Sequence, residues 1–229
     1  RSVSRGLGDV YKRQPAKIKV IGVGGGGGNA VNHMYHQGIG GVSFVLCNTD
    51  AQALRNSPVP VKVQLGAKGE GAGNIPEVAK KLAEESASEV EALFDDNTRM
   101  AFITAGMGGG TGTGAAPVVA RIAKEKGVLT VGIVTIPFLF EGEPKILQAF
   151  AGVEEMRKHV DALLVINNER LCKIYPDLSW TTAFAKADDS LSNAARSIAE
   201  LVSKDGKINL DFADVRTTLK DGGAAVILS

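Results

Sequence analysis

The chain has few of the residues that mark several common functional classes. Its 229 residues include only two cysteines, Cys47 and Cys172, which are far apart and lack the spacing of a metal-binding pair. They predict buried thiols in a reducing compartment. Lysine and arginine (26) balance aspartate and glutamate (25). A basic excess, as on nucleic-acid or anionic-membrane surfaces, is therefore missing, and we expect no nucleic-acid partner.

Long hydrophobic runs are also missing. The longest, Val128 to Phe140, contains glycine and proline and is shorter than the roughly 20 residues that span a bilayer. We therefore expect no direct membrane insertion. Residues 1–14 contain basic residues but no apolar segment, so they do not form a secretory signal and are predicted to be a disordered extension. A hydrophobic content of 44% is enough for one sizeable core.

Glycine, in contrast, is abundant and clustered. Gly108 to Gly114 reads GGGTGTG, between an apolar strand-like run and a helix-like stretch. Such a junction exposes backbone N–H groups to phosphate, and glycine permits the close approach. No Gly-Lys-Ser/Thr follows, so this is not a P-loop. The alternative, a merely flexible turn, does not account for threonines at alternating positions beside a helix start.

A second cluster, Gly24 to Gly28, follows the first strand-like run. Gly22, Gly24 and Gly27 also satisfy the dinucleotide fingerprint G-x-G-x-x-G, with Asp50 at the distance of a ribose-binding acid. An NAD-binding domain is therefore a serious alternative on this segment alone. Two phosphate loops in one sheet instead favour a mononucleotide with a polyphosphate tail.

Short apolar runs alternate with amphipathic helices along the chain, which predicts an α/β fold: a mostly parallel, Rossmann-like sheet with helices on both faces. The strands are predicted at Ile18–Val23, Val42–Leu46, Val61–Leu65, Met100–Thr104, Leu129–Ile136 and Ala162–Ile166; the helices at Ala30–His36, Ile75–Leu93, Ala115–Lys126 and Pro144–His159. Ligands bind beyond the carboxyl ends of such strands. Both glycine clusters should lie there, with the loops Asn48–Asp50, Gly71–Asn74, Phe140–Gly142 and Asn167–Glu169.

A further helix, Asp188 to Ser203, has a single apolar stripe and is predicted to lead out of the nucleotide domain. The expected organisation is a nucleotide domain at 15–187, the connecting helix at 188–203, a loop at 204–216 and, at 217–229, the start of a second domain. The strand-like run Ala224 to Leu228 stops just before the chain ends, so the sequence is expected to be truncated.

Five motifs together resemble the tubulin/FtsZ superfamily, and within it the bacterial cell-division proteins. They are GGGTGTG at 108–114, GGGGGNA at 24–30, NTDAQAL at 48–54, PFLFEG at 137–142 and NLDFADVR at 209–216. The resemblance implies a GTPase that polymerises head to tail into filaments of the division ring, in the cytoplasm at mid-cell. It implies GTP and GDP as ligands, with Mg²⁺ held mainly through phosphates and water. Membrane tethers and other division proteins would bind a missing C-terminal tail.

The resemblance also implies a set of binding residues. The phosphates would contact Gly25, Gly26, Gly27, Gly28, Gly71, Ala72, Gly73, Gly108, Gly109, Gly110, Thr111 and Gly112. Asn29 and Asn168 would approach the base, Phe184 would stack on it, and Glu141 would accept from a ribose hydroxyl. Lys145 stands where the family usually has arginine. Asp188 would take the paired N1–H and N2–H donors of guanine; the alternative is that Asp188 and Asp189 merely cap the helix.

Asp211 and Asp214, with Asn209, are implied to be catalytic. Three residues apart, the two carboxylates share a face if the loop opens a helical turn. The connecting helix spans about 24 Å at about 1.5 Å per residue. With Asp188 at one end and the pair beyond the other, the substrate would have to sit on a neighbouring molecule. The alternatives are a solvated acidic loop, or a relative that binds GTP without hydrolysing it.

Overall fold

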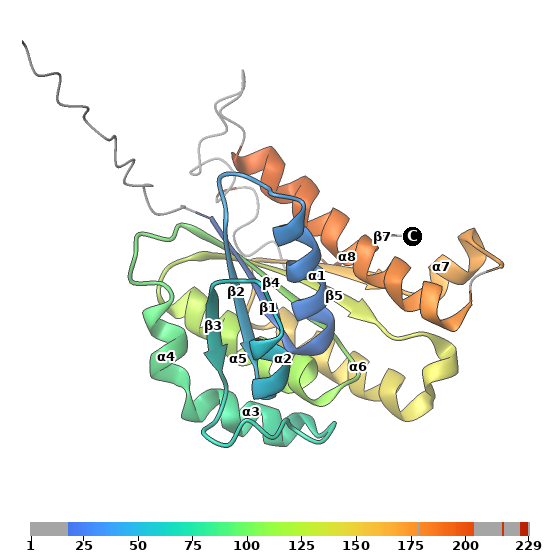
Figure 1. Cartoon of the computed structure of the whole chain (residues 1–229), viewed down its shortest axis with the longest axis horizontal. Helices are drawn as coiled ribbons and strands as arrows, with labels where there is room; N and C mark the ends of the chain where they lie inside the picture. The colour runs from blue at the N-terminus through green and yellow to red at the C-terminus, as the bar shows by residue number, and fades with distance from the viewer. Residues whose placement is uncertain (1–17, 178, 204–216, 218–224, 229) are drawn as a thin grey trace, which may run out of the picture.

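The computed structural model describes residues 18–177, 179–203, 217 and 225–228, which form one α/β unit around a parallel sheet (Figure 1). The strands are β1 (Ile18–Val23), β2 (Ser43–Asn48), β3 (Val61–Gln64), β4 (Met100–Gly106), β5 (Leu129–Ile136), β6 (Ala162–Asn167) and β7 (Ala225–Leu228). The fold class predicted from the sequence is confirmed.

The strand order in the sheet is β3-β2-β1-β4-β5-β6-β7, and every neighbouring pair is parallel. The chain therefore builds outward from β1 to β3 in one direction, then returns to β4 on the other side of β1. Helices that follow β1 and β4 consequently leave the sheet in adjacent positions. This reversal is the switch point at which open α/β sheets bind ligands.

The central strands are apolar throughout because both faces of the sheet are covered. Successive side chains alternate between the two faces: Val20 and Phe102 pack toward α1 (Gly24–His36) and α8 (Trp180–Ser203), whereas Ile21 and Ile103 face the opposite layer. That layer consists of α3 (Pro76–Glu85), α4 (Ala87–Ala92), α5 (Gly110–Glu125) and α6 (Glu143–Arg157). The shorter elements are α2 (Ala51–Arg55), η1 (Leu139–Glu141) and α7 (Glu169–Ile174).

Three helices begin earlier than the sequence predicts. α1 and α5 start inside the glycine clusters, at Gly24 and Gly110 rather than at Ala30 and Ala115. Glycine disfavours helix interiors, but here tertiary packing outweighs that cost, because these helix starts press against the sheet backbone. α8 starts at Trp180, two turns before Asp188, so the connecting helix is longer than expected.

Two further boundaries differ from the prediction. The region predicted as one helix from Ile75 to Leu93 is divided at Ser86, whose hydroxyl accepts a hydrogen bond from the Gly66 N–H at 2.8 Å. Ala225–Leu228 pairs with β6 and extends the sheet. These four residues thus join the first sheet in this structure, where the sequence analysis expected the start of a second domain.

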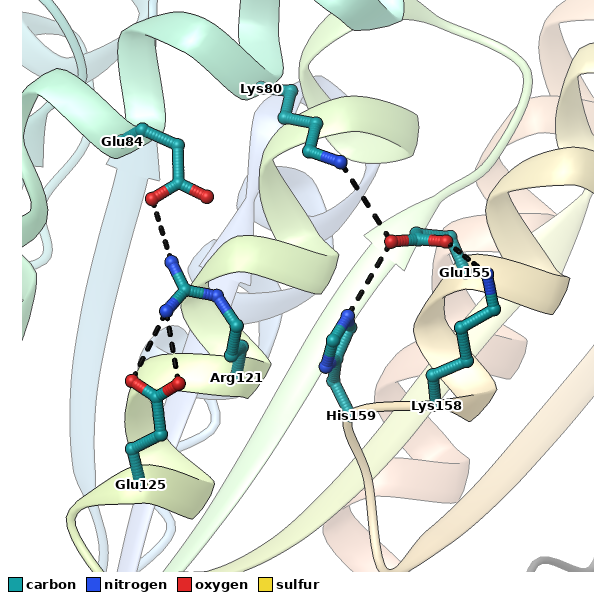
Figure 2. Close-up of polar contacts among 7 residues, drawn as sticks. All are labelled: Lys80, Glu84, Arg121, Glu125, Glu155, Lys158 and His159. Atoms are coloured by element: carbon teal, nitrogen blue, oxygen red, sulfur yellow. Dashed lines mark hydrogen bonds and ion pairs between the residues drawn. The ribbon is translucent and has the colours of Figure 1, made fainter.

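The helical layer of α3, α5 and α6 is tied together by charged side chains at its surface (Figure 2). Arg121 of α5 contacts Glu84 of α3 at 2.6 Å and Glu125 at 3.0 Å. Glu155 of α6 lies 3.8 Å from the Lys80 ammonium of α3 and 2.6 Å from that of Lys158. Arg121–Glu84 joins α5 to α3 and Lys80–Glu155 joins α6 to α3, although partly exposed pairs of this kind contribute little individually.

Candidate functional site

A cavity of about 490 Å³ opens at the carboxyl ends of the central strands. It is bounded by the first turns of α1 and α5, the segments after β5 and β6, and one side of α8. Its lining contains eleven residues that the sequence analysis assigned to the site: Gly25, Gly26, Asn29, Gly109, Gly110, Thr111, Gly112, Glu141, Asn168, Phe184 and Asp188. The structure thus brings together segments spread over more than 160 positions of the chain.

The two glycine clusters form uncapped helix N-termini. The N-cap residues are Val23 for α1 and Gly109 for α5, and neither helix has a side-chain cap or an acidic residue in its first turn. Their first N–H groups therefore have no intrahelical acceptor, and the partial positive charge of each helix dipole is left uncompensated. Two such termini on one cavity have the backbone donors and the partial charge that could hold an anion with several negative charges.

Threonines hold the second glycine cluster in shape. The Thr113 hydroxyl accepts a hydrogen bond from the Gly108 N–H at 2.9 Å, and the Thr111 hydroxyl lies 2.7 Å from that of Thr49. Gly108 has φ +102°, a conformation that favours glycine. Gly112 lies so close to β4 that an added Cβ would be 2.2 Å from the Gly106 carbonyl oxygen. The cluster is therefore a packed turn, which contradicts the alternative of a flexible loop.

Seven predicted residues lie outside the lining of the cavity: Gly27, Gly28, Gly71, Ala72, Gly73, Gly108 and Lys145. Gly27 packs its backbone on β4, where an added Cβ would lie 2.1 Å from the Thr104 carbonyl oxygen. The loop at 71–73 packs beside the first residue of α5, because a Cβ on Gly110 would lie 3.1 Å from that of Ala72. Gly27 and Ala72 therefore pack against the strand and the helix start that border the cavity.

Asp188 lies on α8 and faces α1 across the cavity. The Asn29 amide donates a hydrogen bond to its carboxylate at 3.2 Å. Burial raises the pKa of Asp188 to about 6; the Asn29 hydrogen bond opposes this rise, and the charge of Asp189 adds to it. A carboxylate held this way gains from further hydrogen-bond donors. Because α8 begins at Trp180, the interpretation of Asp188 and Asp189 as helix caps is wrong.

Asn168 and Phe184 complete the same end of the cavity. Asn168 is buried, and among the described residues its Oδ1 atom has no hydrogen-bond partner. A buried unpaired acceptor is costly, so a donor from a ligand would relieve it. Phe184 is partly exposed and meets Phe138 and Phe140 edge to face at 5.6 and 5.9 Å. Its ring is thereby fixed while part of it stays open to a planar ligand.

Glu141 also lines the cavity, although its carboxylate already has protein partners. One oxygen accepts from the Phe138 N–H at 3.0 Å, and the other lies 3.3 Å from the Lys145 ammonium. Each oxygen keeps room for another donor, so a ribose contact by Glu141 stays a prediction. Lys145 contacts Glu141, and its ammonium supports that side chain from outside the cavity.

Asp50, the ribose acid of the dinucleotide alternative, is engaged elsewhere. Its carboxylate caps α2, accepting from the N–H groups of Gln52 at 2.7 Å and Ala53 at 3.3 Å. It does not line the cavity. This arrangement removes the acidic residue on which the dinucleotide interpretation of the first glycine cluster depended.

Six residues of the lining were missed by the sequence analysis: Gly106, Met107, Thr135, Pro137, Ala187 and Leu191. Gly106 and Met107 immediately precede the second glycine cluster, and Thr135 and Pro137 stand at the end of β5, so their place at the strand ends was a usable signal. Ala187 and Leu191 could have been found from helical periodicity, since they flank Asp188 on α8.

The proposed catalytic residues Asn209, Asp211 and Asp214 lie outside the described residues. Within the part of the chain that the structure describes, no group of three or more histidine, cysteine or acidic side chains could hold a metal ion. None of the described helices has the length and apolar character needed to cross a bilayer.

Comparisons with known proteins give a consistent result. Residues 17–176 match the Tubulin/FtsZ family, GTPase domain. The chain is 65% identical over 217 residues to the cell division protein FtsZ of Porphyromonas gingivalis, covering 93% of this chain and 48% of that protein. It is 50% identical over 216 residues to the FtsZ of Wigglesworthia glossinidia brevipalpis, covering 93% of this chain and 56% of that protein. The chain thus spans about half the length of these relatives.

Solved structures agree with the sequence relatives. An empty FtsZ dimer from M. jannaschii superposes with a TM-score of 0.87 at 45% identity, covering 93% of this chain and 62% of that one. The protein CetZ2 from Haloferax volcanii, in a GTPγS-bound protofilament, gives a TM-score of 0.75 at 24% identity and covers 89% of this chain and 63% of that one. The latter similarity bears on the fold alone.

Proposed function

The chain belongs to the tubulin/FtsZ family, and on that premise we propose that its cavity binds GTP and GDP and that GTP is hydrolysed at a contact between two copies. The observation that carries the proposal is the set of groups that one cavity brings together. Its lining contains two uncapped helix N-termini, the Asp188 carboxylate and the unpartnered Asn168 oxygen. A ligand with a polyphosphate at one end and a hydrogen-bonding base at the other fits this arrangement.

Asp188 accounts for a preference for guanine. The Watson–Crick edge of guanine presents two adjacent donors, N1–H and N2–H, and a carboxylate accepts both. Adenine lacks this donor pair, so the half-buried Asp188 would keep its charge without new partners. A site that loses such a pair of hydrogen bonds discriminates by a factor of about 10⁴ or more. Asn29, already bonded to Asp188, would hold the carboxylate in place for the base.

Hydrolysis would require a second copy of the chain. The segment of α8 from Asp188 to Ser203 extends for about 24 Å at about 1.5 Å per residue, so Asp211 and Asp214 follow an end of α8 that is remote from the cavity. On a neighbouring molecule these carboxylates, with Asn209, would orient or deprotonate the attacking water for in-line displacement at the γ-phosphate. Mg²⁺, bound to phosphate oxygens and water, would balance the charge.

The polymer and the cellular role rest on the relatives. The closely similar proteins are named cell division protein FtsZ, and one similar structure is an FtsZ dimer. We therefore infer head-to-tail self-association into filaments of the division ring at mid-cell, in the cytoplasm. Membrane tethers and other division proteins would bind a C-terminal tail beyond Ser229.

Nucleotide competition tests the proposal. GTP, GDP, ATP and NAD would be titrated against a fluorescent guanine nucleotide bound to the folded chain. We expect GTP and GDP to compete and ATP and NAD to fail. Equal competition by ATP would refute the guanine assignment, and displacement by NAD would restore the dinucleotide alternative. Phosphate release would separately test the alternative of a relative that binds GTP without hydrolysing it. Under that alternative, no turnover would be seen at any protein concentration.

A substitution sharpens the same test. In Asp188→Asn, an amide replaces the carboxylate, offering one acceptor and one donor. Xanthine, which has an N1–H donor and a C2 carbonyl, matches that pattern. The variant should therefore bind GTP more weakly and XTP more tightly than the unsubstituted chain. Asp189→Asn is the matched control, because Asp189 lies at the surface within 3.7 Å of His33 and 3.9 Å of Lys186. Unchanged GTP preference in Asp188→Asn would remove Asp188 from the base contact.

A further inference from the structure

Gln148 of α6 is a polar side chain that no part of the proposed function uses. Its amide nitrogen, Nε2, lies 3.0 Å from the carbonyl oxygen of Gly108 and 3.2 Å from that of Gly109. It lies 3.3 Å from a third carbonyl oxygen, that of Asn74 in the loop beside the start of α5. One amide group therefore joins α6 to the second glycine cluster, which borders the cavity, and to the loop at Asn74.

The carbonyls that Gln148 contacts determine where two N–H groups point. In a trans peptide unit the C=O of one residue and the N–H of the next are antiparallel, because the unit is planar. The carbonyl of Gly108 belongs to the same unit as the N–H of Gly109, and the carbonyl of Gly109 to that of Gly110. By holding both carbonyls, Gln148 turns the two N–H groups away from α6. Gly109 and Gly110 both line the cavity.

Such a restraint is needed at this position because glycine does not supply one. Gly108 has φ +102° and Gly109 has ψ −178°. Without a Cβ atom, a peptide unit between two glycines can rotate so that its carbonyl, instead of its N–H, faces the ligand. A carbonyl oxygen directed at a phosphate is repulsive, so the orientation of these two units decides whether the turn binds an anion or rejects it.

α6 is itself fixed at the correct distance to deliver the amide. A Cβ on Gly152, one turn after Gln148, would lie 2.6 Å from a methyl carbon of Thr113 and 3.0 Å from the sulfur of Met107. Further along, Glu155 contacts Lys80 of α3 at 3.8 Å (Figure 2). The close packing at Gly152 leaves the Gln148 amide little freedom to withdraw, and the partly exposed ion pair adds only a small contribution.

We propose that Gln148 is a positioning residue that orients the N–H groups of Gly109 and Gly110 toward the terminal phosphates of the bound nucleotide. This inference rests on the proposed function, because it needs a phosphate-bearing ligand in the cavity. Gln148 does not touch the reacting atoms. Its effect passes through the two peptide units, so it should depend on the phosphates and be independent of the base.

The test compares ligands that differ only in phosphate. Gln148→Met keeps the length of the side chain and removes its donors, whereas Gln148→Glu places a carboxylate against the carbonyls. Leu147→Ala is the matched control, on the adjacent, exposed position of α6. Dissociation constants for guanosine, GDP and GTP would be measured on each purified chain by competition with a fluorescent guanine nucleotide, and the melting temperature without ligand would be recorded.

For Gln148→Met we expect GTP affinity to fall about tenfold, the effect of one charge-assisted hydrogen bond. Guanosine affinity should be unchanged, and the melting temperature should fall by about 2–4 °C. Gln148→Glu should lose more GTP affinity than Gln148→Met, and Leu147→Ala should lose none. Unchanged GTP affinity in Gln148→Met, or equal losses for guanosine and GTP, would overturn the positioning role. If Gln148→Glu fails to fold, Gln148→Met alone decides. Failure of the unsubstituted chain to bind any guanine ligand would instead overturn the proposed function, and this inference with it.

Discussion

Substituting alanine at three neighbouring glycines of α1 should separate folding from ligand binding. A Cβ at Gly27 would lie 2.1 Å from the Thr104 carbonyl oxygen, whereas ordinary contact begins at 3.4 Å. At Gly25 a Cβ would meet no atom of the described residues within 4 Å, although Gly25 lines the cavity. At Gly28 it would only touch Leu46 at 4.0 Å. The same chemical change thus meets three different environments.

The loss of stability expected for Gly27→Ala follows from the overlap of the added Cβ with the Thr104 carbonyl oxygen. α1 would have to move from β4 by about 1 Å, and overpacking of this kind costs about 1–3 kcal/mol or more. Because the obstacle is a backbone carbonyl in a central strand, we expect the upper end, near 3 kcal/mol. For a domain of this size the melting temperature should then fall by about 6–12 °C. Nucleotide affinity of the remaining folded protein should be nearly unchanged.

Gly25→Ala should behave in the opposite way. Alanine favours a helix over glycine by up to about 1 kcal/mol, so the melting temperature should stay the same or rise slightly. The methyl group would stand in the space that we assign to the phosphates. The loss of one charge-assisted hydrogen bond, about 1.5–3 kcal/mol, predicts a 10- to 100-fold weaker GTP affinity. Gly28→Ala should likewise leave the melting temperature the same or slightly higher, but it should not change GTP affinity.

Thermal unfolding without ligand and competition binding of GTP check these expectations on the same three variants. The prediction from these glycines would be contradicted if Gly27→Ala melted within about 2 °C of the unsubstituted chain, because so small a change would mean that the added Cβ does not force α1 away from β4. It would equally be refuted if Gly25→Ala bound GTP normally, because the first turn of α1 would then not contact the phosphates.

Three further predictions concern charged residues. Because burial raises the pKa of Asp188 to about 6 and guanine donors would lower it in the complex, GTP affinity should be constant above pH 7 and weaken as the pH falls below 6, by up to about tenfold per unit. Fluorescence competition at a series of pH values checks this, and a GTP affinity that stayed constant below pH 6 would contradict it. Asp214→Ala should bind GTP normally. When it is mixed with a full-length relative, phosphate release should show that its GTP turnover is lost. Loss of GTP binding would contradict the inference that Asp214 acts on the nucleotide of a neighbouring molecule. The hydrogen bond from Lys158, with His159 and Lys80 nearby, lowers the pKa of the Glu155 carboxyl. The carboxylate therefore stabilises the fold above its unfolded pKa, and this effect disappears as the pH falls through its folded pKa. Unfolding measurements should show that Glu155→Gln is as stable as the unsubstituted chain at low pH and slightly less stable at neutral pH.

Several features of the fold could be predicted because they depend on local sequence. β1 and β5 begin and end where the apolar runs do, at Ile18–Val23 and Leu129–Ile136. Both faces of a central strand are buried, so its whole length is apolar and its limits are visible. The glycine clusters likewise indicated a phosphate site, because few other functions require that backbone freedom beside a helix.

The helix starts could not be predicted, because the energetic reason for them lies in other segments. The helices that begin at Gly24 and Gly110 contain several glycines although glycine disfavours helices, because at Gly27 and Gly112 only a backbone without Cβ atoms can approach β4 so closely. Similarly, Asp188 resembled a helix cap because nothing near it in the sequence shows that α8 begins at Trp180. Propensity describes a residue's immediate neighbours, and tertiary packing outweighs it.

By itself, the sequence determined the parallel α/β class, the two glycine turns at the strand ends and, through its motifs, the family. Only the tertiary structure decided which segments meet. The order of the strands places β1 beside β4 and thus the two glycine turns on one cavity. The contact of Asn29 with Asp188 spans 159 positions, and that of Gln148 with Gly108 spans 40. Such contacts depend on how whole helices pack on the sheet, and that packing is a sum over the entire core which no short segment of sequence contains.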